Sequence, residues 1–271
     1  MNPANRYVLA SLALALAGGA SSAQADTPCG ELDECRVLIE INATDGDIGF
    51  HVLFDVEGWK EARILDPDGK MIFKTQANGS LQDQNLTENF FETAEPVCEA
   101  ALAEDEDEVV VTLAEFLERF PAGAYGFRIK LAQDGELAGD TTLTHSIPAA
   151  PADVDFDGSE ISWSYGDDLG ECTTLPAGFA VAAEASIIGY EVVMDPVNPS
   201  LSKFKFTTQV PNGANSVTVP IEYLASLPAN TPLKIEVGAI ERRPNGSFGN
   251  QTFTEADGFC NNVDQSLCPG D

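Results

Sequence analysis

Three aspartates at alternate positions are the residues of this chain whose type and spacing could hold a metal. Asp153, Asp155 and Asp157 stand in the stretch DVDFDGSEISW at residues 153–163, just before a glycine. The first half of a calcium-binding loop has this pattern, with carboxylate oxygens as ligands and glycine at a sharp turn. Such a loop also needs a glutamate at its twelfth position, where this chain has Ser164.

The same stretch can form an edge β-strand. Successive side chains of a strand point to opposite faces, so the three aspartates would face solvent while Val154 and Phe156 pack inward. Charged side chains on an edge strand also discourage pairing with another chain. We expect this acidic strand, and calcium binding is the alternative. No other cofactor is expected.

The two histidines of the chain lie outside the known catalytic motifs. His51 belongs to the apolar run GFHVLF, which is typical of a strand, and His145 precedes a proline-rich segment. The sequence contains no GxSxG, no HExxH and no phosphate-binding glycine loop. We therefore expect a protein that is not an enzyme. A pocket that places His51 or His145 beside a serine or a carboxylate would favour the alternative, a secreted hydrolase or a subunit of one.

The first 25 residues have the features of a cleaved signal peptide. Arg6 is followed by the apolar run VLASLALALAGGA and by AQA, a small-x-small cleavage site that ends at Ala25. This run is shorter than the about 20 residues that a membrane-spanning helix needs. We expect an exported protein, periplasmic or extracellular, with no membrane span.

The charge restricts the partners of the chain. It has 44 acidic and 14 basic residues and a net charge of −30. Binding to nucleic acid needs a basic surface, and an anionic membrane would repel this protein. We expect neither partner.

Short β-rich segments separated by glycine, proline and asparagine run through both halves of the chain. No long segment has the helical period, so we expect no helix longer than about three turns. A stiff Pro-Ala linker at 148–152 separates the halves. EFLERFPAGAYGFRIKL (115–131) can be aligned with EYLASLPANTPLKIEV (222–237), which indicates one helical turn before a strand, repeated once in each half.

The second half resembles a fibronectin type III domain. Trp163 matches the tryptophan of the family's second strand, Tyr190 the tyrosine of its third, and Leu227-Pro228 the crossover before its sixth. The sixth strand departs from the family pattern, because Leu233 stands in place of the corner tyrosine.

The first half resembles an immunoglobulin-like sandwich more distantly, with Tyr125 as its corner aromatic residue. The two resemblances together imply an all-β protein of two tandem immunoglobulin-like or fibronectin type III-like β-sandwich domains. The expected boundaries are 26–147 for the first domain, 153–257 for the second and 258–271 for a cysteine-containing tail.

Such a fold implies a non-catalytic binding or interaction protein, whose ligand would be a protein or a carbohydrate. Loops at one end of a sandwich commonly bind ligands. We therefore expect the ligand at the long loop 166–186 and at the loop ERRPNGSFGN, where Arg242 and Arg243 form an adjacent basic pair next to Asn245.

Six cysteines in an exported chain indicate disulfides. Three precede the linker and three follow it, so complete pairing requires at least one bridge between the halves. Within the first half we expect Cys35–Cys98, because sandwich topology places both residues near one end. The cysteines are Cys29, Cys35, Cys98, Cys172, Cys260 and Cys268.

Overall fold

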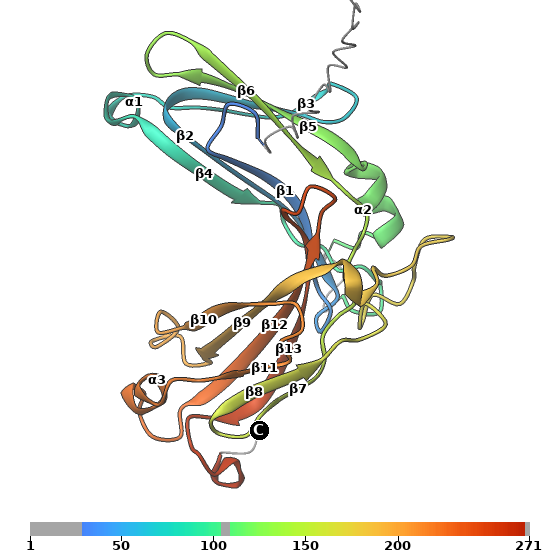
Figure 1. Cartoon of the computed structure of the whole chain (residues 1–271), viewed down its shortest axis with the longest axis vertical. Coiled ribbons are helices and arrows are strands. Elements are labelled where there is room, and N and C mark those ends of the chain that lie inside the picture. Colours follow the sequence, from blue (N-terminus) through green and yellow to red (C-terminus); the bar gives the residue numbers. More distant parts are fainter. Residues whose placement is uncertain (1–28, 104–108, 269–271) are drawn as a thin grey trace, which may run out of the picture.

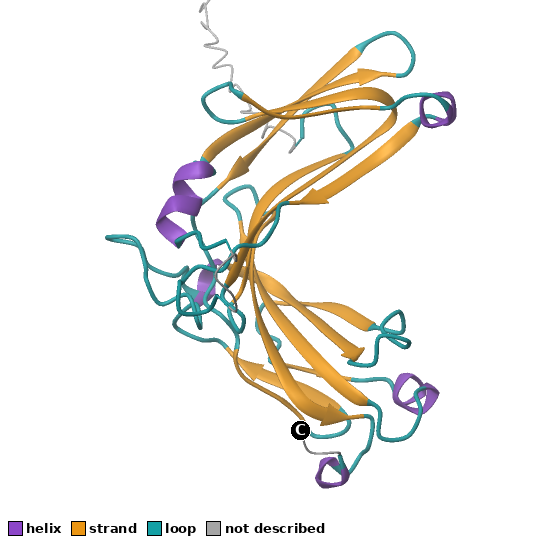
Figure 2. Cartoon of the chain, turned by 180° about the vertical axis from the view of Figure 1, so that it is seen from behind, coloured by secondary structure: helices purple, strands orange, loops and turns teal. Residues whose placement is uncertain are grey.

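The computed structural model describes residues 29–103 and 109–268, and the expected signal peptide lies outside this range. Two lobes built from strands meet at an angle (Figure 1). The helices lie at the ends of the lobes, outside the sheets (Figure 2). They are α1 (Ser80–Gln84), α2 (Leu113–Arg119) and α3 (Ile221–Ser226). The expectation of short helices is confirmed for the described residues, and none of their helices has the length and apolar character needed to cross a membrane.

The first lobe is a sandwich around one long, bent strand. The first part of β2 pairs with β1 and β4, and its last part pairs with β3 and β5. The strand changes sheets near Gly58, whose φ of 69° suits glycine. Both sheets bury aromatic side chains, including Phe54, Trp59 and Phe127. The strands are β1 (Glu34–Asn42), β2 (Asp47–Leu65), β3 (Met71–Gln76), β4 (Leu86–Glu92), β5 (Gly123–Leu131) and β6 (Glu136–Leu143).

The second lobe is a sandwich of two sheets, with strand orders β11-β8-β7 and β10-β9-β12-β13. Trp163 and Tyr190 pack together in its core, with ring centroids 5.3 Å apart. The expected all-β fold of two tandem immunoglobulin-like sandwiches is confirmed. The strands are β7 (Ala152–Phe156), β8 (Glu160–Ser164), β9 (Ile187–Pro196), β10 (Phe206–Pro211), β11 (Ser216–Thr218), β12 (Pro232–Arg242) and β13 (Phe248–Cys260).

The two aligned segments of the sequence have the same local structure. In the first lobe α2 precedes β5, and in the second α3 precedes β12. The aligned residues Leu117 and Leu224 are both buried. Tyr125 also makes the expected corner contact, because its hydroxyl donates to the carbonyl of Pro121 at 3.1 Å.

The two sandwiches share a sheet. β13 of the second lobe pairs in parallel with β1 of the first, with Glu40 opposite Gln251. The segment 148–151 is buried between the lobes, where Thr252 Oγ1 donates to the carbonyl of Pro148 at 2.8 Å. This ladder and the contacts beside it fix the angle between the lobes.

The described disulfides are Cys29–Cys35, Cys98–Cys172 and Cys260–Cys268. The expected bridge between the halves is confirmed by Cys98–Cys172, but the expected Cys35–Cys98 pair is wrong. A tight turn after Cys29, in which the N–H of Leu32 donates to its carbonyl, brings Cys29 back to Cys35. Cys98 is instead held beside Gly46, next to the long loop that carries Cys172.

Candidate functional site

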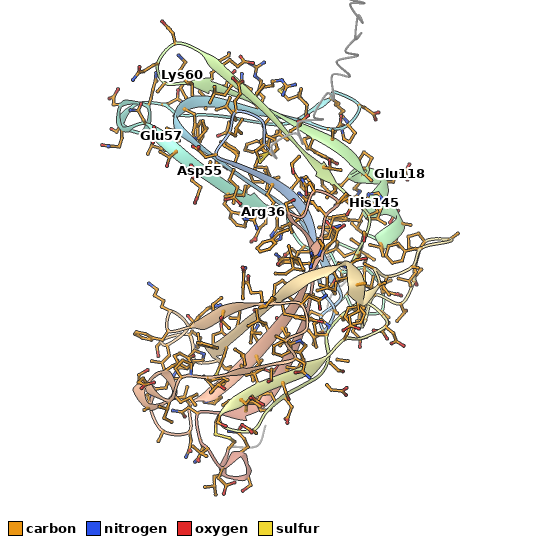
Figure 3. The ribbon with its side chains drawn as sticks, viewed as in Figure 1. Arg36, Asp55, Glu57, Lys60, Glu118 and His145 are labelled. Atoms are coloured by element: carbon orange, nitrogen blue, oxygen red, sulfur yellow. A yellow bond between two sulfur atoms is a disulfide. The ribbon has the colours of Figure 1, made fainter. Side chains whose placement is uncertain are left out.

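The inner side of the angle between the lobes is one concave face. It is the outer surface of the continuous sheet formed by β4, β2, β1, β13, β12 and β9. Arg36 lies on this side of the molecule, whereas His145 lies on the far side, near α2 (Figure 3). Strand alternation puts Leu38 and Glu40 of β1 on the concave face and leaves Val37, Ile39 and Ile41 in the core.

A hollow of about 370 Å³ lies at the middle of the concave face. Residues of both lobes line it, because the ladder between β1 and β13 brings their strands side by side. Its apolar lining comes from the first lobe, and Glu191 and Gln251 come from the second. The lining includes Arg36, Leu38, Leu53, Phe90, Glu191 and Gln251.

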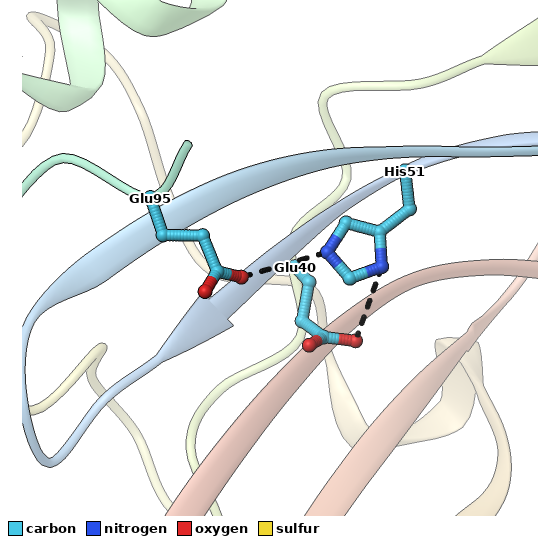
Figure 4. A group of neighbouring side chains, drawn as sticks. All are labelled: Glu40, His51 and Glu95. Atoms are coloured by element: carbon cyan, nitrogen blue, oxygen red, sulfur yellow. Dashed lines mark ion pairs between the residues drawn. The ribbon is translucent and has the colours of Figure 1, made fainter. Parts of the chain in front are cut away.

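His51 lies in this hollow between carboxylates. Its Nδ1 is 3.9 Å from Glu40 Oε2, and its Nε2 is 3.6 Å from Glu95 Oε1 (Figure 4). Glu92 approaches Nε2 from β4, with its Oε2 at 3.9 Å. The His51 side chain is only 10% exposed, and its Nε2 is buried without a hydrogen-bond partner. We call Glu40, His51 and Glu95 the His51 cluster.

The backbone around the His51 cluster places its side chains. Cross-strand register puts Leu38 opposite His51. Glu95 follows β4 in a segment that stays bound to β2, because the N–H of Thr93 donates to the carbonyl of Phe50 at 3.1 Å. The cluster thus takes Glu40 from β1, His51 from β2 and Glu95 from the segment after β4.

The carboxylates of the concave face shift one another's pKa. Burial, together with the charges of Glu95 and Glu191, raises the pKa of Glu40 to about 8. Burial and Glu95 raise the pKa of Asp47 to about 6. Burial lowers the pKa of His51, although Glu92 and Glu95 act in the opposite direction. The two shifts favour the uncharged forms of Glu40 and His51.

A second hollow, of about 210 Å³, continues the acidic surface toward β12. Glu40 and Glu95 belong to its lining, together with Asp47, Glu236 and Glu255. Lys234 joins two of these carboxylates, with its Nζ 2.8 Å from Glu236 and 3.0 Å from Glu255. The concave face is thus strongly acidic.

The structure separates the three residues expected to bind a ligand at the ERRPNGSFGN loop. Arg242 and Asn245 are exposed, but Arg243 is only 2% exposed. The Arg243 guanidinium donates to Thr141 Oγ1 at 3.0 Å and to the carbonyl of Val37, both in the first lobe. Burial lowers its pKa to about 10. Arg243 therefore connects the lobes and does not face an external ligand.

Replacing Arg243 with alanine is expected to lower the free energy of unfolding by about 3 kcal/mol. The change leaves buried acceptors of the first lobe unpaired and removes the positive charge near buried Glu241. Urea denaturation measures the effect. Arg242→Ala is the matched control, because Arg242 is exposed and its loss should cost less than about 0.5 kcal/mol. Equal effects of the two variants would contradict this role of Arg243.

The acidic stretch at 153–163 forms β7 and β8 on the second lobe. Asp153 and Asp155 are exposed while Phe156 is buried, so the side chains alternate as expected of a strand. Asp157 Oδ1 accepts from the backbone N–H groups of Ser159 and Glu160, both at 2.8 Å, and these bonds lower the pKa of Asp157. Calcium binding by these aspartates stays an untested alternative.

Sequence reasoning placed His51 on a strand but did not identify Glu40 or Glu95 as its neighbours. His145 lies apart, with its Nε2 2.8 Å from the carbonyl of Phe120. A glutamate between two isoleucines, as in the IEI of β1, predicts an outward-facing acidic side chain and nothing more. Only the pairing of β1 with β2 could have brought Glu40 and His51 together.

No protein-family model matches the chain, and no curated protein matches it. A crystal structure of the FN1–FN3 domains of chicken CNTN1 matches with a TM-score of 0.29 and 14% identity, over 82% of this chain and 65% of that one. The BSP domain of a biofilm-associated protein matches with a TM-score of 0.22 and 12% identity, over 87% of this chain and 30% of that one. The chain therefore spans less than two thirds of either structure, and likenesses this low carry no argument about function.

Proposed function

We propose that this chain is an exported, non-catalytic binding protein that takes a basic segment of a partner protein into the concave face. The three disulfides support export, because such bonds persist in oxidising compartments. We also propose that residues 153–257 form a fibronectin type III domain, that 26–147 form an immunoglobulin-like domain joined to it through 148–152, and that 258–271 form the C-terminal tail.

One observation carries the proposal: carboxylates stand beside apolar side chains in the hollow between the lobes. Leu38, Leu53 and Phe90 form an apolar strip, and Glu191 lies across from it on β9. Phe90 is 57% exposed, so its ring is accessible to a ligand. A lysine or arginine has a matching shape, with an apolar stem and a charged head. Its head would pair with Glu191, and its stem would lie against Phe90.

The frame around the hollow suits binding without rearrangement. Glu191 is oriented by Gln209, whose Nε2 donates to Glu191 Oε2 at 2.6 Å. The shared sheet and the Cys98–Cys172 bridge hold the two walls at a fixed separation. A pre-organised site loses less entropy on binding. The net charge of −30 would also speed the approach of a basic partner.

The histidine beside carboxylates is the arrangement that would favour the alternative, a hydrolase. Hydrolysis through a hydroxyl or thiol nucleophile needs a serine, threonine or cysteine within reach of the imidazole. The residues that line the two hollows include none of these types. The arrangement therefore gives no support to a hydrolase of the serine, threonine or cysteine type.

A labelled decamer of alternating lysine and serine should bind the full chain more tightly than a matched glutamate–serine decamer. Fluorescence anisotropy in about 0.15 M salt with a chelator measures both, since salt at that level screens distant surface charges. Glu191→Gln and Phe90→Ala should each weaken binding of the lysine peptide about fivefold or more, because each removes one of the two contacts.

The controls are Glu222→Gln and Phe204→Ala, which change exposed residues elsewhere on the second lobe. Glu191→Gln and Glu222→Gln have the same net charge, so a difference between them isolates the hollow from general attraction. Equal binding of the two peptides, or equal loss in both glutamine variants, would contradict the proposal.

A further inference from the structure

The Nε2 atom of His51 is a buried polar atom without a partner. Such atoms are rare in native proteins, because a buried polar group without a partner has lost its hydrogen bonds to water. Among the described residues, Nε2 has no hydrogen-bond partner, and the nearest carboxylate oxygens lie at 3.6 and 3.9 Å, beyond hydrogen-bonding distance. This spacing leaves a gap between the imidazole and the carboxylates.

Gly49 lies next to the gap between His51 Nε2 and Glu95 and has no side chain to fill it. A Cβ at this position would lie 2.9 Å from His51 Nε2 and 2.8 Å from Glu95 Oε1, too close for a real side chain. Gly49 has no left-handed φ, so its backbone conformation does not require glycine. The absence of a side chain here keeps the space between the imidazole and Glu95 open.

The distances suit a metal ion in this space. Glu40, His51 and Glu95 each offer one ligand atom, and these atoms lie within 4.8 Å of one another. In a tetrahedral zinc site with bonds of about 2.0–2.1 Å, ligand atoms stand roughly 3.4 Å apart. The 3.6 Å between His51 Nε2 and Glu95 Oε1 is already close to that value. Glu40 Oε2 lies 3.9 Å from Nδ1, the other ring nitrogen, so its side chain has to turn toward Nε2 to become the third ligand.

The ligand types favour a transition metal over calcium. Calcium and magnesium take oxygen ligands, whereas imidazole nitrogen with carboxylate oxygen suits zinc and its neighbours. Three protein ligands would leave a fourth position for water or for a group of a bound partner.

We propose that His51 Nε2, Glu95 and Glu40 bind one zinc ion in the space above Gly49, on the concave face. This site does not depend on the proposed recognition of a basic segment. Peptide binding is measured with a chelator present, and zinc binding is measured without peptide, so either proposal can fail alone.

Titration calorimetry of the chelator-treated full chain with zinc chloride tests the site. Millimolar calcium in the buffer occupies weak carboxylate sites on the acidic surface. We expect one zinc ion per chain, with an affinity reduced about 100-fold or more by His51→Ala. Glu95→Gln and Gly49→Ala should each reduce it at least tenfold, the first by removing a ligand and the second by filling the space.

Cobalt(II) gives a second readout, because a tetrahedral site with a nitrogen ligand absorbs more strongly in the visible range than a hydrated ion on carboxylates. This band should appear at one equivalent and disappear in His51→Ala. His145→Ala is the matched control, since it removes the other imidazole of the chain, which contacts the carbonyl of Phe120 and is not part of the His51 cluster. Circular dichroism and melting verify that each variant is folded.

Two results would overturn the proposal. One is that, in millimolar calcium, the wild-type chain shows only the weak zinc binding expected of surface carboxylates. The other is tight binding that His51→Ala and Gly49→Ala leave unchanged.

Discussion

Replacing Cys98 and Cys172 together with serine is expected to lower the free energy of unfolding by about 4.5 kcal/mol. The bridge closes a loop with a sequence separation of 74 residues, and loss of its constraint on the unfolded chain accounts for a value of this size. The expected loss is large against a typical total stability of about 5–15 kcal/mol. Urea denaturation of the oxidised protein measures it, with circular dichroism as the signal.

The Cys29–Cys35 bridge supplies the matched control. Its sequence separation is only 6 residues, so the double serine variant should cost about 2 kcal/mol by the same loop-entropy argument. Both double variants leave no unpaired thiol. A loss for Cys98/Cys172 no larger than that for Cys29/Cys35 would show that the Cys98–Cys172 bridge is not needed to hold the lobes together.

The fold class could be predicted from the sequence because its signals are local. Alternating side chains predict strands one segment at a time. Turn residues are local signals too: Asp66 Oδ1 accepts from the N–H of Lys70 at 2.8 Å in the turn between β2 and β3. The pairing of β1 with β13 could not be predicted, because it joins residues more than 200 positions apart. Parallel pairing leaves no turn signal between the two strands.

The candidate site could not be predicted for the same reason. Arg243 looked like an exposed basic residue at a hairpin tip, but this end of the second sandwich packs on the first lobe. The loop 166–186 also contacts the first lobe at this end, since the N–H of Glu171 donates to the carbonyl of Ala43. The end at which such sandwiches often bind ligands is thus used for the contact between lobes. The accessible acidic surface is the concave face instead.

Replacing Asn250 with alanine is expected to lower the free energy of unfolding by about 4 kcal/mol. Asn250 is fully buried where β13 meets β1. Its Oδ1 accepts from the N–H of Ile39 at 2.9 Å, and its Nδ2 donates to the carbonyls of Thr144 at 3.0 Å and Ser146 at 3.2 Å. The Asn250 side chain thus accepts the hydrogen bond from β1 that a backbone carbonyl would accept in a ladder, one residue before β1 and β13 begin to pair in parallel. Its removal leaves one buried N–H and two part-buried carbonyls unpaired, and a buried group left unpaired costs about 1–3 kcal/mol.

Two further variants separate these bonds from the effect of a cavity. Asn250→Asp keeps the volume and the acceptor for Ile39 but turns an oxygen toward the carbonyls of Thr144 and Ser146, so it should also cost at least about 2 kcal/mol. Asn245→Ala removes an exposed asparagine at the hairpin tip and should cost less than about 1 kcal/mol. Urea denaturation compares all three. If Asn250→Ala costs no more than Asn245→Ala, the hydrogen bonds of Asn250 do not hold the lobes together, and the angle that shapes the concave face depends on the other contacts between the lobes.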